Sequence, residues 1–260
     1  MDQQTSNLKK SFLWDEKYSH FRDYDKEVKF FDQIINEFSS VKKNSFIADL
    51  GCGTGTHTLK LSEMGYKTIG VDKDISMIKN ALLRKKTKDS NFVCADMIDY
   101  NPRTKLNVLL LTYYVFQQYT MPEHQNYALS KFSKNLTEDG LIIFEFLNDQ
   151  RNSDEFIENY NYQANLIYNS CTDILMSSRN RNISKEVKEL NFNFNIEYNS
   201  IKFKLTDAYT LWRATYKKVK MMLEYSDFEI VFLTDNYSMK PFFDDYNSYK
   251  FIVVAQKKHK

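Results

Sequence analysis

Three glycines and a carboxylate are crowded into one short run of the chain, Phe46–Gly55 (FIADLGCGTG). Gly51, Gly53 and Gly55 occupy alternate positions, and Asp49 comes just before them. Glycine has no Cβ, so a turn built from it can bring backbone N–H groups close to a ligand. Since the whole chain holds only six glycines, three of them in one turn are a concentrated signal for a ligand site.

The residues around this run predict the elements that hold it. The apolar residues 46–48 are typical of a short buried strand, and Thr56–Leu61 is typical of the opening of a helix. A strand, a glycine turn and a helix N-terminus together suit a nucleotide-type ligand, because free backbone N–H groups point out of the helix end. Two more acids, Asp72 and Asp96, close the next two predicted strands.

The spacing of the glycines argues against a dinucleotide. The dinucleotide-binding fingerprint is G-x-G-x-x-G, whose third glycine lets the helix pack on the strand. This chain instead has G-x-G-x-G, followed by Thr56 and His57. The carboxylate of Asp49 would also repel a pyrophosphate, whereas it suits a ligand that carries a positive amine. A dinucleotide-dependent dehydrogenase is therefore disfavoured.

Apolar periodicity predicts strands and helices that alternate with short links. Such alternation gives a parallel sheet with helices on both faces, so we expect a doubly wound, Rossmann-like α/β core with a seven-stranded, mostly parallel sheet. Glu138–Gly140 is expected to turn into the strongest strand. The predicted strands are 46–50, 67–71, 91–95, 108–112, 141–146, 229–233 and 251–255, and the predicted helices are 26–39, 56–64, 74–84, 122–136 and 215–225.

The chain divides into a core, a flap and an insertion. Residues 26–150 and 212–260 form the expected core. Residues 1–25 are dense in aromatic side chains and are expected to form an N-terminal flap, either as a cover for a ligand or as padding on the core. Residues 151–211 lack βα alternation, and 191–196 alternate polar and apolar residues as a half-buried strand does. We expect this insertion to form a β-rich lid over the substrate.

Composition limits the class of partner. The net charge is only +2 and the pI is near 8.2, which gives no push toward nucleic acid or membrane. Cys52, Cys94 and Cys171 have no metal-ligand spacing and fit a reduced compartment. The polar N-terminus does not resemble a signal peptide, and no apolar run approaches the roughly 18–20 residues of a membrane span. We expect a cytoplasmic monomer or homodimer that acts on a small molecule, without nucleic acid, membrane or metal.

The glycine run and the later acids, in this order, resemble the class I S-adenosylmethionine (SAM)-dependent methyltransferases. The similarity lies in Asp49–Gly55 (DLGCGTG), in Gly70–Asp72 with Met77 one helical turn later, and in Ala95–Met97 after the third strand. It covers residues 45–150 most strongly. At 136–140 the chain has Leu-Thr-Glu-Asp-Gly, where the family has an L-x-P-G-G turn.

A small-molecule branch of that family is similar at three further places. These are Trp14–Tyr18, His57 after the glycine turn, and Trp212–Tyr216. The branch includes glycine and amino-sugar N-methyltransferases. The resemblance implies SAM as the cofactor and a set of residues that hold it, namely Tyr18, Asp49, Gly51, Gly53, Gly55, His57, Asp72, Lys73, Met77, Asp96, Met97 and Thr112.

Each implied role has a physical reason. The glycines let backbone approach the methionine part of the cofactor, and Asp49 can contact its amino group directly or through water. A carboxylate at Asp72 can accept both ribose hydroxyls, and Asp96 can accept from the adenine amine while Met97 packs on the ring. Thr112 closes the fourth strand beside the sulfonium. Taken singly, each acid could instead cap a turn or a helix.

The acceptor site is expected after the fourth strand, in Tyr113–Tyr119, where the family places pocket residues. This run keeps an aromatic at Phe116 but differs around it, so the substrate does not carry over from relatives. Its aromatics could hold a cationic or planar substrate or simply pack in the core. The candidates for catalysis or acceptor contacts are Tyr114, Glu145, Asn148, His124 and Arg213. His124 could act as a base or simply be exposed. Arg213 could bind an anionic group of the substrate or form a surface ion pair.

The leading hypothesis is methyl transfer from SAM to a small polar metabolite at an amine nitrogen, of amino-sugar or amino-acid type. Proximity and an in-line SN2 geometry would carry it. A small-molecule O-methyltransferase and a non-catalytic SAM-binding subunit remain as alternatives. A nucleic-acid methyltransferase is disfavoured, because no Asn-Pro-Pro-Tyr/Phe tetrapeptide follows the fourth strand.

Overall fold

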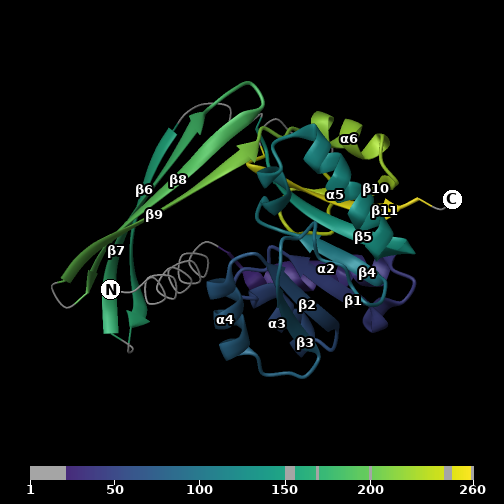
Figure 1. Ribbon diagram of the computed structural model, residues 1–260, viewed down its shortest axis with the longest axis horizontal. Helices are drawn as coiled ribbons and strands as arrows, with labels where there is room; N and C mark the ends of the chain where they lie inside the picture. Colours follow the sequence, from purple (N-terminus) through teal and green to yellow (C-terminus); the bar gives the residue numbers. More distant parts are fainter. Residues whose placement is uncertain (1–21, 150–155, 168–169, 199–200, 243–247, 259–260) are drawn as a thin grey trace.

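The computed structural model describes residues 22–149, 156–167, 170–198, 201–242 and 248–258. In this part of the chain an α/β core carries a separate β-sheet that stands beside it (Figure 1). The core contains a seven-stranded sheet, called sheet A below, and the second sheet, sheet B, has four strands. The predicted N-terminal flap lies almost entirely outside the described residues.

Sheet A has the strand order β10-β11-β5-β4-β1-β2-β3. Strands β5, β4, β1, β2 and β3 run parallel, whereas β11 is antiparallel to both β5 and β10. The predicted doubly wound, mostly parallel sheet of seven strands is thereby confirmed. The strands are β1 (Phe46–Leu50), β2 (Lys67–Asp72), β3 (Ser90–Cys94), β4 (Leu106–Leu111), β5 (Leu136–Leu147), β10 (Phe228–Thr234) and β11 (Lys250–Lys257).

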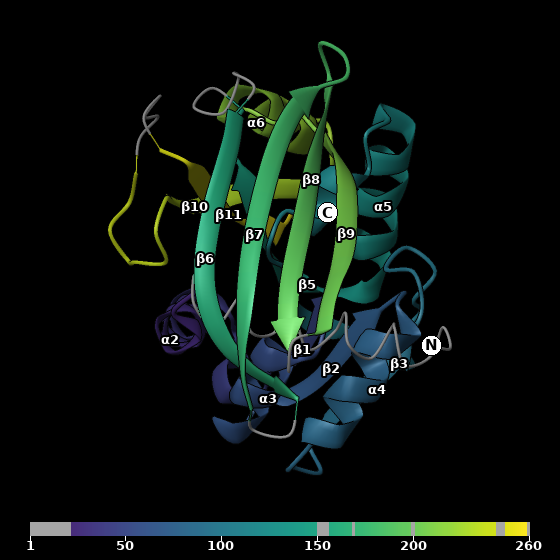
Figure 2. The same cartoon turned by 90° about the vertical axis from the view of Figure 1, so that its left-hand side faces the viewer.

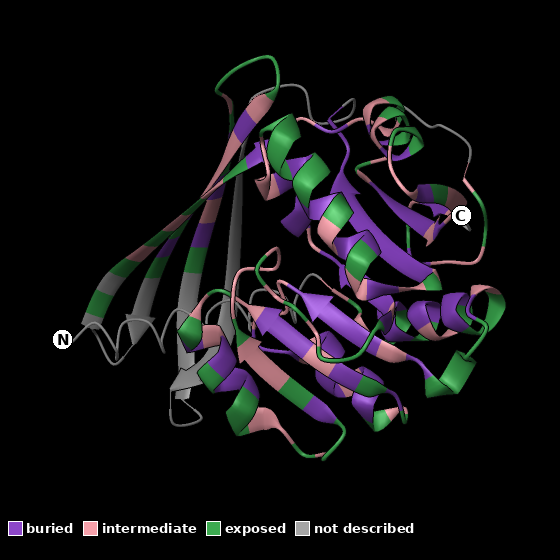
Figure 3. Cartoon of the chain, turned by 45° about the vertical axis from the view of Figure 1, so that its right-hand side comes forward, coloured by how far each residue is buried: buried purple, intermediate pink, exposed green. Residues whose placement is uncertain are grey.

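Helices cover both faces of sheet A, because alternate residues of its central strands point to opposite sides. On one face, Ile47 of β1 packs with Phe31 and Ile35 of α2. On the other face, Ala48 packs in a cluster with Phe132 of α5 and with α6. Buried residues line both layers in Figure 3. The helices are α2 (Tyr24–Phe38), α3 (Thr56–Glu63), α4 (Ile75–Arg84), α5 (Pro122–Asn135) and α6 (Tyr216–Glu224), with short 3-10 turns η1 (Lys42–Asn44) and η2 (Val115–Gln118).

Sheet B is an antiparallel meander of four long strands in the order β6-β7-β8-β9. Figure 2 shows it as a layer in front of the core. Its strands alternate as predicted for 191–196: Phe192 and Phe194 are buried, whereas Asn193 and Asn195 are exposed. The strands are β6 (Phe156–Ile167), β7 (Ser170–Asn182), β8 (Val187–Tyr198) and β9 (Ile201–Trp212). The fold class, including its β-rich insertion, thus matches the prediction.

One expected turn is wrong. Glu138–Gly140 was predicted to turn before the strand, but β5 is already extended from Leu136, directly after α5. A register shift against β4, between Leu106 and Val108, accommodates the extra length. Gly140 is needed there because a Cβ would lie 2.9 Å from the side chain of Leu136.

No helix in the described part of the chain is both long enough and apolar enough to cross a membrane.

Candidate functional site

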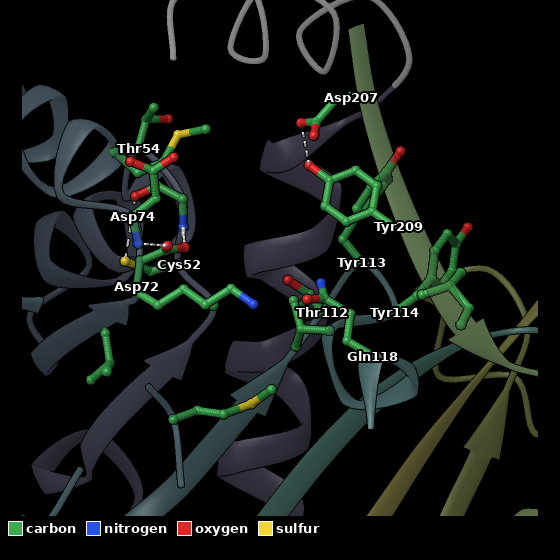
Figure 4. Close-up of a pocket in the computed structure, with 18 of the residues that line it drawn as sticks. Cys52, Thr54, Asp72, Asp74, Thr112, Tyr113, Tyr114, Gln118, Asp207 and Tyr209 are labelled. Carbon is green, nitrogen blue, oxygen red and sulfur yellow. Dashed lines mark hydrogen bonds between the residues drawn. The ribbon is translucent and has the colours of Figure 1, made fainter. Parts of the chain in front are cut away.

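A pocket of about 550 Å³ lies between the carboxyl ends of the central strands of sheet A and the strands β8 and β9 of sheet B. Strand order reverses between β1 and β4, and ligands of open α/β sheets bind at such a switch point. Figure 4 shows its two sides, with Cys52, Thr54 and Asp72 facing Tyr113 and Tyr209 across the pocket. We call the first side the glycine wall and the second, which includes β8 and β9, the aromatic wall.

The glycine turn joins β1 to α3 and forms part of the glycine wall. All three glycines have left-handed backbone, with φ of 72°, 55° and 82° at Gly51, Gly53 and Gly55. They differ in what a Cβ would meet. A Cβ added to Gly53 would have no other atom within 4 Å, whereas a Cβ added to Gly55 would lie 2.6 Å from the ring of Phe92. Gly53 therefore leaves open space beside the pocket, and Gly55 serves the packing of the turn on β3.

Asp72 ends β2 and holds the glycine turn in place. Its Oδ2 accepts a hydrogen bond of 2.8 Å from the backbone N–H of Gly53, and its Oδ1 accepts one of 2.8 Å from Asp74 N–H. Burial raises the pKa of this carboxyl group. Each carboxylate oxygen has a second acceptor position. Because Asp72 lines the pocket, those positions are at hand for hydroxyl groups of a ligand.

Asp49 lies beneath the turn and does not line the pocket. Its Oδ2 accepts from the hydroxyl of Thr58 at 2.7 Å. Its Oδ1 is buried without a hydrogen-bond partner among the described residues. Burial raises the pKa of this group. A buried acceptor without a donor needs one from a water or a ligand, which is what the resemblance implies for this position.

The end of β3 supplies the next part of the glycine wall. Asp96 Oδ1 accepts hydrogen bonds from the hydroxyl of Tyr119 at 2.8 Å and from the backbone N–H of Ile98 at 3.2 Å. Burial and the neighbouring Asp96 raise the pKa of Tyr119, so its hydroxyl stays a donor. Asp96 lines the pocket together with Lys73, Met77 and Met97.

His57, near the start of α3, links α2 to the end of β4. Its Nε2 lies 2.6 Å from Glu27 Oε2, and its Nδ1 lies 3.5 Å from the hydroxyl of Thr112. Burial disfavours the charge of Glu27, but hydrogen bonds from His57 and Arg22 hold the pKa of Glu27 below its ordinary value. His57 and Thr112 both line the pocket, whereas Glu27 fixes the imidazole from behind.

A strained turn after β4 opens the aromatic wall. Tyr113 and Tyr114 both have left-handed backbone, with φ of 52° and 62°, and their rings stack at 5.0 Å. Such conformations are costly for residues other than glycine and occur often at functional sites. Here the backbone N–H of Tyr113 donates to Glu145 Oε2 at 2.7 Å, which holds the turn.

Glu145 sits behind that turn and does not line the pocket. It is 2% exposed and also accepts from Arg22, Tyr237 and Lys250, at 3.1, 2.7 and 2.7 Å. Burial would raise its pKa, but the cations Arg22 and Lys250 hold the pKa far below the ordinary value. Glu145 is thus an ionised anchor behind the wall.

Strands β8 and β9 complete the aromatic wall with residues that sequence reasoning did not single out. Tyr209 donates its hydroxyl to Asp207 Oδ2 at 2.9 Å. The rings of Tyr209 and Phe192 lie 6.3 Å apart. The alternation of β8 identified Phe192 as inward-facing, but nothing in the local pattern said what it faces. The members of this part are Leu190, Phe192, Asp207, Ala208, Tyr209, Thr210 and Leu211.

The pocket brings together most of the predicted cofactor residues and few of the predicted catalytic ones. Among the latter, His124 is exposed near the start of α5, and Arg213 donates to Asp149 Oδ2 at 2.9 Å; neither lines the pocket. Tyr18 lies outside the described residues. The predicted residues that do line the pocket are Gly51, Gly53, His57, Asp72, Lys73, Met77, Asp96, Met97, Thr112 and Tyr114.

Comparison with known proteins agrees with this geometry. Residues 47–140 match the family described as "Methyltransferase domain". A glycine/sarcosine N-methyltransferase from Aphanothece halophytica is 24% identical over 164 residues, which are 62% of this chain and 58% of the relative. The chain therefore matches little more than half the length of that relative.

Solved structures share the whole architecture. A SAM-dependent methyltransferase from Clostridium acetobutylicum is 16% identical, with a TM-score of 0.77 over 95% of this chain and 96% of its own. A SAM-bound amino pentose methyltransferase from Micromonospora echinaspora is 13% identical, with a TM-score of 0.74 over 95% and 97%. At these identities the likeness concerns the fold. The methyltransferase-domain match covers residues 47–140, and the likeness in fold extends over nearly the whole chain.

Proposed function

We propose that this protein transfers the methyl group of SAM to an amine nitrogen of a small polar metabolite. The observation that carries the proposal is the division of one pocket into two unlike walls. The glycine wall offers a left-handed turn and the strand-end acids Asp72 and Asp96, and the aromatic wall faces it. About 550 Å³ is within the usual range for a site that holds small molecules.

The glycine wall suits SAM at its methionine and ribose ends. Gly53 leaves room that a side chain would fill, so the backbone of the turn can approach the methionine part. The orphan Oδ1 of Asp49 can serve the cofactor's amino group through a water. The remaining acceptor positions of Asp72 suit the two ribose hydroxyls, with Lys73 beside them.

The far end of the same wall suits adenine. Asp96 uses only Oδ1 for its bonds to Tyr119 and Ile98, so Oδ2 is available to accept from the adenine amine. Met77 and Met97 offer thioether side chains that can pack on the ring faces. Thr112 and His57 line the same pocket, with His57 Nδ1 3.5 Å from the Thr112 hydroxyl.

SAM supplies an electrophilic methyl group on a sulfonium. The chain's own contribution is to bind the acceptor, orient it in line with that methyl and exclude water. Correct positioning is worth roughly 7–11 kcal/mol of the barrier. Tyr114 is buried and forms part of the aromatic wall, and Glu145 positions the turn that carries it from behind. The proposal assigns no step to His124 or Arg213, since neither lines the pocket.

Nitrogen is the preferred acceptor atom for two reasons. The matched relative is a glycine/sarcosine N-methyltransferase, and one similar solved structure is a sugar N-methyltransferase. An alcohol also needs a base at the moment of attack more acutely than a neutral amine does.

The test is turnover with matched acceptors. The purified protein is incubated with SAM and with amino acids and amino sugars, each beside its hydroxy counterpart, and release of S-adenosylhomocysteine (SAH) is followed. Mass spectrometry then locates the added methyl. Release with an amine and a methyl on its nitrogen supports the proposal. Methylation of the hydroxy counterparts would favour an O-methyltransferase, and SAH binding without turnover would favour a non-catalytic subunit.

A further inference from the structure

We propose that His57 is the base that takes the proton of the acceptor amine, on its Nδ1, before the nitrogen attacks the methyl group. An amine in water at pH 7 is mostly protonated, because the pKa values of amines lie at roughly 8–10. An ammonium has no lone pair, so methylation at nitrogen needs a group that accepts a proton. The inference rests on the proposed function, since it supplies the step that an amine acceptor requires. Glu27 is the residue that positions His57.

The hydrogen bonds of Glu27 determine which nitrogen of His57 is free to accept a proton. Arg22 donates to Glu27 from Nε at 2.9 Å and from Nη2 at 2.7 Å. Burial works against the charge of this carboxyl group, but the bonds from His57 and Arg22 hold its pKa below the ordinary value. An ionised carboxylate only accepts hydrogen bonds, so His57 Nε2, 2.6 Å from Glu27 Oε2, carries the hydrogen. The lone pair of the neutral imidazole is then on Nδ1.

The partners of the ring indicate that Nδ1 faces the pocket. Nδ1 lies 3.5 Å from the hydroxyl of Thr112, and His57 and Thr112 both line the pocket. Glu27, on the side of Nε2, does not line it. A separation of 3.5 Å is long for a hydrogen bond, so Thr112 uses the lone pair only weakly. An amine that hydrogen-bonds to Nδ1 is in place to hand over its proton.

Helix α2 holds the imidazole in one orientation. His57 is only 6% exposed. The rings of Tyr24 and Phe31 meet it nearly edge-on, with centroids at 5.1 and 5.4 Å. The same helix therefore supplies the packing and, through Glu27, the hydrogen bond that fix the ring. A base held by a second residue in this way is the arrangement that activates an imidazole in many enzymes.

The charges around His57 suit a ring that gains a proton during the reaction. Glu27 of α2 and Asp49 of β1 both attract a positive imidazole and offset the charge that the proton brings. Arg22 opposes that charge but is itself paired with Glu27 at 2.7 Å. The N-terminus of α3, in which His57 is the second residue, opposes a positive charge that is present at rest. Tyr24 is the remaining titratable neighbour among the described contacts.

The acids that line the pocket are weaker bases. The ordinary pKa of a carboxyl group is about 4, whereas that of an imidazole is about 6.5, so a carboxylate takes a proton from an ammonium less readily. Asp72 and Asp96 are the acids proposed to hold the cofactor, and Asp207 already accepts from a tyrosine hydroxyl. Asp74 caps α4 through the N–H and the hydroxyl of Ser76.

The other titratable groups of the lining hold their protons at neutral pH. Burial raises the pKa of the Cys52 thiol and of the Tyr114 hydroxyl well above their ordinary values. Lysine and arginine side chains, here Lys73 and Arg22, are already protonated and accept nothing. His57 is the one imidazole among the described residues of the lining. It is therefore the group best suited to take the proton.

The step conserves atoms and charge. An N–H bond of the bound ammonium breaks, its electron pair stays on the nitrogen, and the proton forms a new bond at His57 Nδ1. The positive charge thereby moves from the acceptor to the imidazole, beside Glu27. The lone pair of the acceptor nitrogen then forms the N–C bond as the C–S bond breaks and its electrons stay on sulfur. His57 returns its proton to water once the product has left.

The kinetic test compares His57→Asn with the natural protein at pH 7 and pH 9.5, with the amino acid or amino sugar that is methylated fastest. Without the base, the variant must take up amine that is already neutral in solution. Its kcat/KM at pH 7 should therefore fall by roughly tenfold or more, and the deficit should shrink by roughly tenfold or more at pH 9.5, where far more of the amine is neutral. His124→Asn removes an exposed imidazole outside the pocket, so it is the matched control and should behave as the natural protein does.

A second measurement needs no acceptor. Nitrogen-15 NMR of the SAH-loaded protein, labelled at histidine, reports which imidazole nitrogen carries a hydrogen. At pH 8, His57 should carry it on Nε2 and leave Nδ1 bare. Glu27→Gln should give a mixture of the two tautomers, because an amide can donate as well as accept. A residue that merely packed against α3 would have no such effect.

Three results would overturn the inference. The deficit of His57→Asn could be equal at both pH values, the variant could be as fast as the natural protein at pH 7, or His57 could carry a hydrogen on Nδ1 at pH 8. Should His57→Asn fail to fold, which its SAH affinity and thermal unfolding reveal, the NMR result on the natural protein decides alone. Failure of the proposed function would look different, because no amine would be methylated or the methyl group would be found on oxygen.

Discussion

The backbone N–H of Tyr113 donates a hydrogen bond of 2.7 Å to the buried carboxylate of Glu145. This bond couples the end of β5 to the left-handed turn after β4, where Tyr113 and Tyr114 begin the aromatic wall. The same carboxylate binds Arg22 and Lys250, so one ionised group holds three separate parts of the chain at the back of the pocket. The strain of the turn is offset by this anchor.

Replacing Glu145 by Gln should destabilise the protein strongly. Glutamine keeps the shape of the side chain but lacks the negative charge that Arg22 and Lys250 face. Loss of one partner of a buried ion pair costs roughly 3–5 kcal/mol, and we expect the lower end because Arg22 keeps Glu27. Urea unfolding measures it. Glu138→Gln, on the same strand but exposed and paired with Lys257, should cost no more than about 1 kcal/mol. Equal effects of the two variants would contradict the anchor role.

Low pH should remove the stabilisation that ionised Glu145 provides. The pKa of Glu145 is held far below its ordinary 4.5 by Arg22 and Lys250, against the opposing effect of burial. A carboxylate with a lowered folded pKa contributes its stability above the unfolded pKa and loses it as pH falls toward the folded one. The free energy of unfolding should therefore drop below about pH 4.5, and drop less steeply in Glu145→Gln. Urea unfolding at a series of pH values from neutral to about pH 3 measures this. An equally steep fall in the free energy of unfolding in both proteins would contradict the role given to Glu145.

The two glycines of the turn should respond differently to alanine. Both have positive φ, so each substitution costs about 1 kcal/mol or more in backbone strain. Gly53→Ala places its Cβ in open space beside the pocket, so it should fold and bind SAH roughly tenfold more weakly. Gly55→Ala drives its Cβ into Phe92 and should lose about 1–3 kcal/mol more stability. Thermal unfolding and SAH titration of both variants decide, and a reversed pattern would contradict the division of roles.

Asp72→Ala should weaken SAH binding without unfolding the protein. The change removes the acceptors proposed for the ribose hydroxyls and frees the N–H of Gly53, and hydrogen bonds to a charged group are worth about 1.5–3 kcal/mol each. Calorimetry should show a loss of at least tenfold in affinity. Asp99→Ala, an exposed acid beyond the same sheet edge, is the control and should bind normally. Unchanged affinity in Asp72→Ala would remove the ribose role.

Much of the glycine wall could be predicted because its signals are local. Strand β1 begins and ends at the predicted residues, Phe46 and Leu50, and Asp72 and Asp96 lie at or just beyond the ends of the next two strands. Each signal is a short run in which an apolar strand meets a turn residue. Since parallel strands of one sheet end at one edge, local signals sufficed to gather these residues in space.

Of the aromatic wall, the sequence pointed only to the run Tyr113–Tyr119, because the contacts that build this wall join distant parts of the chain. Arg22 and Glu145 meet across 123 positions, and no pattern near either residue indicates the other. Tyr113 and Tyr114 adopt left-handed backbone although neither is a glycine or asparagine, the residue types from which such a conformation can be predicted. The alternation of β8 revealed that Phe192 faces inward, but only the docking of sheet B shows that Asp207 and Tyr209 face the glycine wall.

The central claim is that the glycine wall holds SAM. Its most direct test is calorimetric titration of the natural protein with SAH and, separately, with NAD⁺ under the same conditions. SAH should bind saturably, and NAD⁺ should not bind. Saturable binding of NAD⁺, with none for SAH, would contradict it.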